Sequence, residues 1–165
     1  MVIFQALTRN VVPVTLLAIL MMPAAALPDS TSRPFKASVV THEQPGFRPD
    51  CPSKFGGTTT GTGKSTHMGE VSLNATDCIT PMEDHFIFEG VFTLTAANGD
   101  TITGGYRGAF VPVEAGSTFS LSGAKFEITG GTGRFRGAKG IAELKGDQNI
   151  ATGKGKIEAD GTISY

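Results

Sequence analysis

The sequence of 165 residues contains no tryptophan, only two cysteines and only three histidines. Two cysteines cannot form a structural zinc site by themselves, and the spacing of the nearby histidines, His67 and His85, fits no metal-binding motif. We therefore expect no bound metal. The chain also lacks an excess of charge of either sign, with 14 Lys and Arg against 15 Asp and Glu. This balance argues against nucleic acid or an anionic membrane surface as the main partner.

A helical repeat of apolar residues is missing as well. After residue 53, glycine, threonine and β-branched or aromatic residues dominate, and no stretch keeps the 3.6-residue period of an amphipathic helix. Strands without helices to cover them must pack as a sandwich or close into a barrel. The composition therefore predicts an all-β domain.

The N-terminus has the three parts of a secretory signal peptide. One positive charge, Arg9, precedes an apolar run over 11–22, and small residues follow at 23–26. The run is too short to cross a bilayer, which needs ~20 residues. We predict that residues 1–26 are a signal peptide, so that the mature protein is secreted to the periplasm or the medium and is not stably inserted in a membrane. A retained membrane anchor is the alternative.

The two cysteines, Cys51 and Cys78, both follow the predicted signal peptide. In an oxidising compartment they can form a disulfide. In the chain-entropy model, the loop that this bond closes would stabilise the folded state by roughly 3–4 kcal/mol. The alternative is two buried free thiols. We expect the disulfide.

A proline-rich segment separates the signal peptide from the rest of the chain. We expect an irregular leader over residues 27–52, with one possible strand over 35–41, and a β-barrel domain over 53–165. The prolines of this leader are Pro28, Pro34, Pro45, Pro49 and Pro52.

Alternation of apolar and small residues predicts seven or eight strands in the domain. The clearest hairpin joins two of them through Asn98-Gly99, since both residues accept positive φ. Another strand changes its apolar phase, so we expect a bulge near Gly123-Ala124. Glycines within the strands favour a small closed antiparallel barrel of about eight strands over a sandwich. The expected strands are 54–60, 66–74, 86–96, 102–110, 118–129, 136–145 and 154–165.

Motifs for phosphate binding and for nucleophilic catalysis are incomplete. The Gly-Thr-rich segment 57–65 ends in Gly-Lys-Ser, but Thr58 stands where a phosphate-binding loop needs glycine, and a strand rather than a helix follows. No Gly-x-Ser-x-Gly elbow is present. No catalytic residues are therefore assigned.

The segment 130–140, Gly-Gly-Thr-Gly-Arg-Phe-Arg-Gly-Ala-Lys-Gly, resembles the late hairpin of dirigent proteins and of the allene oxide cyclase group. The segments 93–100 and 160–165 are similar to small secreted proteins of the same barrel type. The resemblance implies a closed barrel of eight antiparallel strands with an apolar lumen, no cofactor, and a homotrimer in many plant members.

The resemblance also implies that a few polar residues point into the lumen. On the expected register these are Tyr106 and Arg136, beside the apolar Phe88 and Phe92, and all four are candidate ligand-binding residues. Tyr106 as ordinary core and Arg136 as a rim charge are the structural alternatives. A buried arginine needs an acidic partner, for which the candidates are Asp84 and Glu89.

Two functions follow from these expectations. The first is a non-catalytic secreted barrel that binds a small apolar molecule or has a structural role. The second is a cofactor-free isomerase, cyclase or coupling guide that acts in the lumen. We favour the first, because no acid–base or nucleophilic set emerges and because a fold does not carry a function with it. A lumen filled by aromatic side chains would leave only the structural role.

Overall fold

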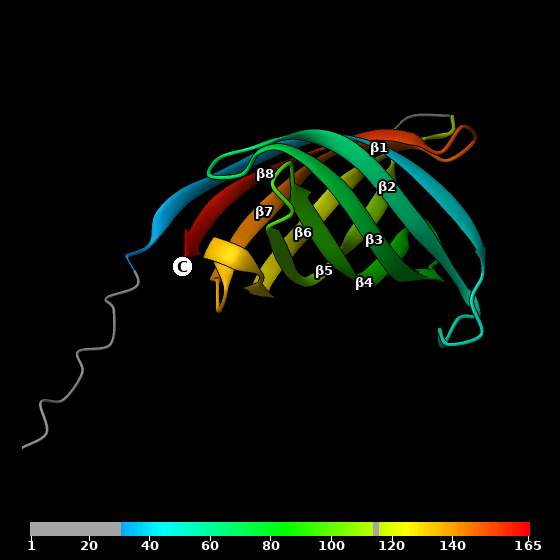
Figure 1. The fold of residues 1–165 in the computed structure, drawn as a ribbon. Helices are drawn as coiled ribbons and strands as arrows, with labels where there is room; N and C mark the ends of the chain where they lie inside the picture. The colour runs from blue at the N-terminus through cyan, green and yellow to red at the C-terminus, as the bar shows by residue number, and fades with distance from the viewer. Residues whose placement is uncertain (1–30, 114–115) are drawn as a thin grey trace, which may run out of the picture.

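The structure, a computed structural model, describes residues 31–113 and 116–165. The predicted signal peptide lies outside this described part of the chain. The described residues form eight antiparallel strands and one short 3-10 helix, η1 (Gly133–Phe135) (Figure 1). The strands are β1 (Arg33–Phe47), β2 (Phe55–Ser65), β3 (Gly69–Pro81), β4 (Phe86–Ala96), β5 (Thr101–Pro112), β6 (Thr118–Gly131), β7 (Lys139–Asn149) and β8 (Lys154–Ser164).

The strands close into a barrel in simple up-and-down order. Each strand pairs with the next along the chain, and β1 pairs with β8 to complete the cylinder. Closure leaves no unpaired sheet edge. The prediction of an all-β closed antiparallel barrel of about eight strands is confirmed.

The hairpin at residues 97–100 forms where the sequence predicts it. β4 spans the expected 86–96, and Gly99 has a φ of +87°. Asn98 does not have positive φ; instead its Oδ1 accepts a hydrogen bond from the amide of Asp100 at 3.1 Å. The loop thus has four residues between the strands, and only its glycine adopts the left-handed conformation.

The expected bulge in β6 is confirmed. Gly123 has a φ of +57°, and the pairing of β6 with β7 is interrupted between Ser120 and Lys125. Buried side chains fall on one phase before this point, at Phe119, and on the other phase after it, at Ala124. The bulge therefore keeps the apolar side chains of both halves inside the barrel.

The expected leader over 27–52 is corrected by β1. Its strand is longer than the possible strand over 35–41, and it pairs with β2 and β8 along most of its length. The barrel therefore begins at Arg33 rather than at residue 53. Alternate residues of β1 face the interior, but two of them are the polar Thr41 and Glu43, so the apolar alternation of the strand is interrupted.

One end of the barrel is sealed by aromatic and aliphatic side chains. Phe135 of η1 is fully buried, its ring lies 4.8 Å from that of Tyr165, and Phe35 is fully buried near the start of β1. We call this the sealed end; η1 lies beside the C-terminus in Figure 1. Fully buried isoleucines at the same end complete the seal: Ile102, Ile128 and Ile163.

The opposite end carries the β1–β2, β3–β4, β5–β6 and β7–β8 connections, and we call it the loop end. A disulfide joins Cys51 to Cys78, with 5.3 Å between the Cα atoms, and Cys51 is fully buried. The predicted disulfide is confirmed. It fastens the β1–β2 connection to β3 at the loop end of the barrel.

Candidate functional site

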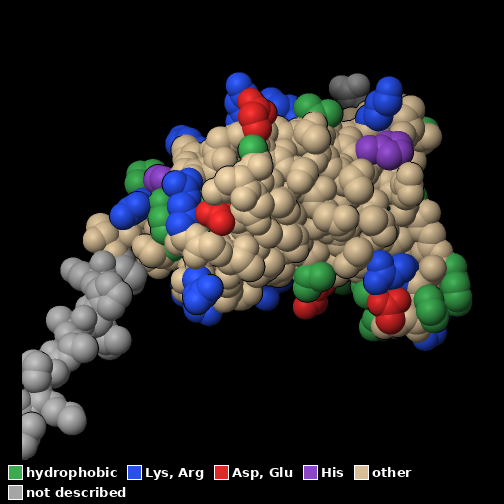
Figure 2. Space-filling model, in the orientation of Figure 1, with side chains coloured by type: hydrophobic (Ala, Val, Ile, Leu, Met, Phe, Trp, Pro, Cys, Tyr) green, Lys and Arg blue, Asp and Glu red, His purple; other side chains and the backbone are tan. Residues whose placement is uncertain are grey.

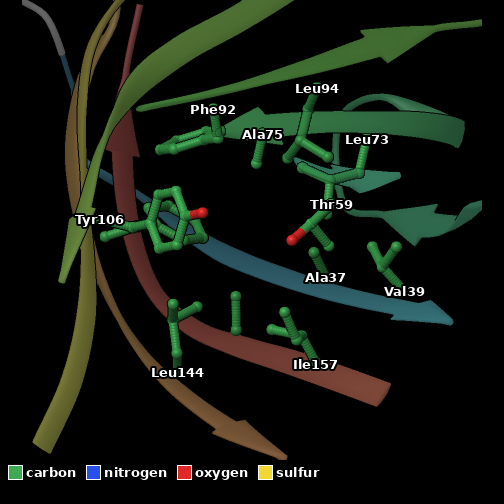
Figure 3. A pocket seen from close by; sticks show the side chains of 12 residues that line it. Ala37, Val39, Thr59, Leu73, Ala75, Phe92, Leu94, Tyr106, Leu144 and Ile157 are labelled. Atoms are coloured by element: carbon green, nitrogen blue, oxygen red, sulfur yellow. The ribbon is translucent and has the colours of Figure 1, made fainter. Parts of the chain in front are cut away.

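The lumen is not completely filled. An apolar cavity of about 60 Å³ lies inside the barrel. Side chains from opposite walls converge on it, and the ring of Tyr106 reaches in from β5 (Figure 3). Three alanines on the interior face leave the space, because larger side chains there would fill it. These are Ala37, Ala75 and Ala159.

A tyrosine–aspartate pair lies on the inner wall of the barrel beside this cavity. The hydroxyl of Tyr106 donates a hydrogen bond of 2.8 Å to Oδ2 of Asp77. The amide of Gly57 donates one of 2.8 Å to Oδ1 of the same carboxylate. Asp77 belongs to β3 and Tyr106 to β5, so the strand between them, β4, is bridged on the inside of the barrel.

Burial shifts the pKa of both partners. It raises the pKa of Tyr106 above its ordinary value, and the neighbouring Asp77 raises it further, so the hydroxyl remains a donor at neutral pH. Burial also raises the pKa of Asp77, against the opposing effect of the hydrogen bonds from Tyr106 and Gly57. Asp77 therefore accepts hydrogen bonds from two donors, while its burial disfavours the ionised form of the carboxyl group.

Glu43 of β1 brings a second carboxyl to the same place. Its side chain is only 8% exposed, and Oε1 is buried without a hydrogen-bond partner. Burial, and then the charge of Asp77, raise the pKa of Glu43 from 4.5 to about 7. Gly57 makes room for it, since a Cβ atom at this position would lie 2.6 Å from Oε1 of Glu43.

Two further cavities adjoin the carboxyl groups. A small polar cavity of about 30 Å³ has Glu43, Asp77 and Tyr106 in its wall. A mouth cavity of about 220 Å³ lies at the loop end and shares Glu43, Phe110 and Gln148 with the polar cavity. The other walls of the mouth cavity are apolar: Pro45, Phe55, Ile79, Phe86, Ile150 and Gly153.

Three of the four predicted lumen residues face the interior. Tyr106 lines both the apolar and the polar cavity, Phe92 lines the apolar cavity, and Phe88 lines the polar cavity. Whether these residues bind a ligand stays a prediction.

The placement of Arg136 in the lumen is wrong. The residue follows η1 and is exposed, because β7 begins at Lys139 rather than at residue 136. The candidate acidic partners lie elsewhere too. Asp84 contacts His85 at 2.7 Å in the β3–β4 connection, and Glu89 is exposed on β4.

The carboxyl groups of the site were missed in the sequence. The expected strand over 66–74 stopped before Asp77, and Glu43 lay in the expected leader. A signal was present, since the alternate positions of β3 before and after Asp77, from Val71 through Ala75 to Ile79, are buried. Continuing that alternation past Asn74 would have placed Asp77 inside the barrel.

The arrangement can hold a hydrogen-bond donor and exchange a proton near neutral pH. Asp77 and Glu43 supply acceptor oxygens, and Glu43 titrates close to neutrality. Among the described residues, no group of three or more His, Cys, Asp and Glu side chains is arranged to hold a metal ion. In the same part of the chain, no helix is long and apolar enough to cross a membrane.

These features define a class: a closed antiparallel barrel of eight strands with polar groups buried in a partly open lumen. No protein-family model matches the chain, and no curated protein sequence matches it. Among solved structures it is similar to the pterocarpan synthase dirigent protein GePTS1, with 16% sequence identity and a TM-score of 0.53. The alignment covers 87% of this chain and 95% of that one. The chain thus has a dirigent-like barrel fold; this comparison does not show a link to allene oxide cyclase.

Proposed function

We propose that the barrel is a binding protein for a small, largely apolar molecule that enters the lumen from the loop end. The observation that carries this proposal is the mouth cavity of about 220 Å³, whose apolar walls lead to the buried Glu43. Ligand sites have this composition, with apolar walls and a few polar groups that fix orientation. A purely structural barrel would gain stability by filling such a space.

A titration with benzyl alcohol, a neutral aromatic probe, tests this proposal. In NMR spectra, the methyl groups of Ile79 and Ile150, which line the mouth cavity, should shift and saturate. The methyl groups of Val40 and Val91, which are exposed and line none of the three cavities described above, should not shift and serve as the internal control. Shifts that spread over the outer wall, or none at millimolar probe, would refute lumen binding. Mass spectrometry of the purified protein should also detect a co-purified small molecule.

A second candidate function is cofactor-free isomerisation or cyclisation in the lumen. Glu43 favours it, because a carboxyl with a pKa of about 7 can both donate and accept a proton at neutral pH. The test is exchange of the α-hydrogens of cyclohexanone in heavy water, followed by NMR. Wild-type protein should accelerate the exchange, and Glu43→Gln should abolish the acceleration while Glu143→Gln, at an exposed position on β7, should not. No acceleration over buffer leaves only the binding function.

We also propose that the protein is secreted and that residues 1–26 direct its export. The disulfide between Cys51 and Cys78 supports this proposal, because such bonds persist in oxidising compartments. N-terminal sequencing of the exported protein should begin at Leu27. A full-length chain retained in the membrane fraction would contradict cleavage.

The family resemblance further supports a homotrimer as a proposal. Exposed aliphatic side chains are present on the outer wall, for example Val40, Val91 and Ile141. Val40 and Ile141 lie on β1 and β7, which flank β8 in the closed barrel, so the two neighbours of a subunit in a cyclic trimer could cover both. Sedimentation equilibrium should give three times the chain mass, and a monomer would remove this proposal.

A further inference from the structure

The polar cavity has an unbalanced charge composition. Glu43 and Asp77 are both buried in its wall, at 8% and 4% exposure. Among the described residues that line the polar and mouth cavities there is no lysine, arginine or histidine. A buried carboxylate without a positive partner is costly. The barrel therefore buries two carboxyl groups with no cation in the described walls of these cavities, and burial raises the pKa of both.

Outside the cavity, Arg48 corrects this imbalance only in part, since its charge lowers the pKa of Asp77 but burial outweighs it and the pKa is raised. Arg48 reaches the carbonyl oxygen of Gly57 at 3.4 Å, but its guanidinium is engaged by Asp50 at 2.8 Å. Asp147 of β7 also borders the polar cavity and is exposed, which adds a third acid. Oε1 of Glu43 is thus buried without a hydrogen-bond partner, and the described residues in the wall of the polar cavity include no cation. Two donors in that wall, the hydroxyl of Tyr106 and the side-chain amide of Gln148, are engaged by Asp77 and by the carbonyl oxygen of Gly153.

Aromatic rings line the same cavity as these acids. Phe88 packs against Phe110 with 4.6 Å between ring centroids and against Tyr106 with 5.7 Å. All three rings line the polar cavity. Aromatic faces attract cations, most strongly where water is excluded. Carboxylates and aromatic rings, which line this cavity together, are two kinds of group that recognise an organic cation.

We propose that the polar cavity binds the ammonium group of a primary amine, with Glu43 Oε1 as its acceptor and the apolar body of the amine in the mouth cavity. This inference rests on the proposed lumen-binding function and adds the charge and chemical class of the ligand. An ammonium group supplies three hydrogen-bond donors and a positive charge. Oε1 of Glu43 has neither a donor nor a cation as its partner.

The cavity sizes agree with this division of the ligand. The polar cavity of about 30 Å³ has room for a group of about the size of water, and an ammonium head is such a group. The mouth cavity of about 220 Å³ admits an aryl or short alkyl body. Glu43 lines both cavities, so it lies where head and body would meet.

Calorimetric titrations with benzylamine and benzyl alcohol test the inference, since the two probes differ in charge and not in their aryl body. At neutral pH benzylamine should bind about tenfold or more tightly than benzyl alcohol. Glu43→Gln should remove this preference, and Glu143→Gln, which makes the same charge change at an exposed site, should retain it. In buffers of different ionisation enthalpy, benzylamine should release a proton from the wild type and none from Glu43→Gln.

The outcomes separate the two proposals. Equal binding of both probes to the wild type would overturn the ammonium site and leave lumen binding intact. A preference for benzylamine that survives in Glu43→Gln would overturn the assigned acceptor. No binding of either probe would overturn both proposals. Thermal unfolding of each variant shows whether it is folded, and Asp77→Asn provides a second neutral substitution in the same cavity.

Discussion

At the scale of single residues, the lumen combines groups that folding alone does not favour. Glu43 is buried with Oε1 unpartnered, whereas Asp77 has two donors and Tyr106 has its acceptor. A buried polar atom without a partner typically costs about 1–3 kcal/mol. Glu43 is thus the residue at which stability and a binding role are most clearly in conflict.

The free energy of unfolding should fall as the pH rises from about 4.5 to about 7. The carboxyl of Glu43 has a pKa of 4.5 when unfolded and about 7 when folded, so the folded state holds more protons in this window. The loss should be about 3 kcal/mol. Asp77, whose pKa is also raised, acts in the same direction. Urea unfolding at several pH values measures the slope.

Glu43→Gln is the control for this pH dependence. The difference in unfolding free energy between Glu43→Gln and wild type should grow with pH in the same window, while Glu143→Gln should follow the wild type. A wild-type protein that becomes more stable between pH 4.5 and 7 would contradict the burial of an uncompensated Glu43.

Tyr106→Phe should destabilise the barrel by about 1–3 kcal/mol, because it leaves the buried Asp77 carboxylate with one donor fewer. The other tyrosine offers a matched control. The hydroxyl of Tyr165 accepts a hydrogen bond from Arg33 in an exposed position, so Tyr165→Phe should cost well under 1 kcal/mol. Thermal unfolding of both variants measures these losses. Equal losses would mean that the buried Tyr106–Asp77 hydrogen bond stabilises the barrel no more than the exposed bond of Tyr165 does.

At the scale of elements, η1 seals the barrel. Phe135 is fully buried and packs on Tyr165, while Arg134 beside it is exposed. Gly133 before them has a φ of +58°, and Gly137 after them has one of +78°. These glycines let the chain turn tightly enough to place one aromatic side chain inside and the charged neighbours outside.

Phe135→Ala should cost about 3–5 kcal/mol of unfolding free energy, because a fully buried aromatic ring is removed from the sealed end. The exposed neighbour supplies the control, since Arg134→Ala should cost less than about 1 kcal/mol. Chemical denaturation measures both. A loss below 1 kcal/mol for Phe135→Ala would show that the sealed end does not depend on this ring.

At the scale of the whole molecule, stability depends on closure of the cylinder. β1 and β8 lie at opposite ends of the barrel sequence and pair through residues 33–42 and 154–163. Charged side chains are scattered over the face shown in Figure 2 rather than gathered into one patch. The disulfide adds a covalent link between the β1–β2 connection and β3.

Removing the disulfide should lower the free energy of unfolding by roughly 3–4 kcal/mol, because the bond closes a loop of 27 residues in the unfolded chain. The double variant Cys51→Ala/Cys78→Ala, compared with wild type with and without reductant, measures this loss. Intact mass should rise by two hydrogens on reduction. An unchanged mass would contradict the bond.

Much of this fold could be predicted locally. The alternation over 86–96, the Asn98-Gly99 loop and the bulge at Gly123 depend on neighbouring residues and were recognised. The full length of β1 cannot be read from local alternation, because its interior face includes Glu43 and the surrounding prolines are typical of an irregular segment. The predicted inward position of Arg136 is wrong because β7 begins at Lys139, three residues later than the expected strand, so that Arg136 lies in the preceding turn.

The sequence by itself determined the all-β class, most strand positions and the pairing partners of Cys51 and Cys78, since these follow from local alternation, turn residues and a count of two. Only the tertiary structure decided where the polar site lies. Glu43, Asp77 and Tyr106 come from β1, β3 and β5, and nothing in their spacing along the chain joins them. Closure of the barrel turns all three toward one lumen and removes water from them, and that burial raises the pKa of Glu43.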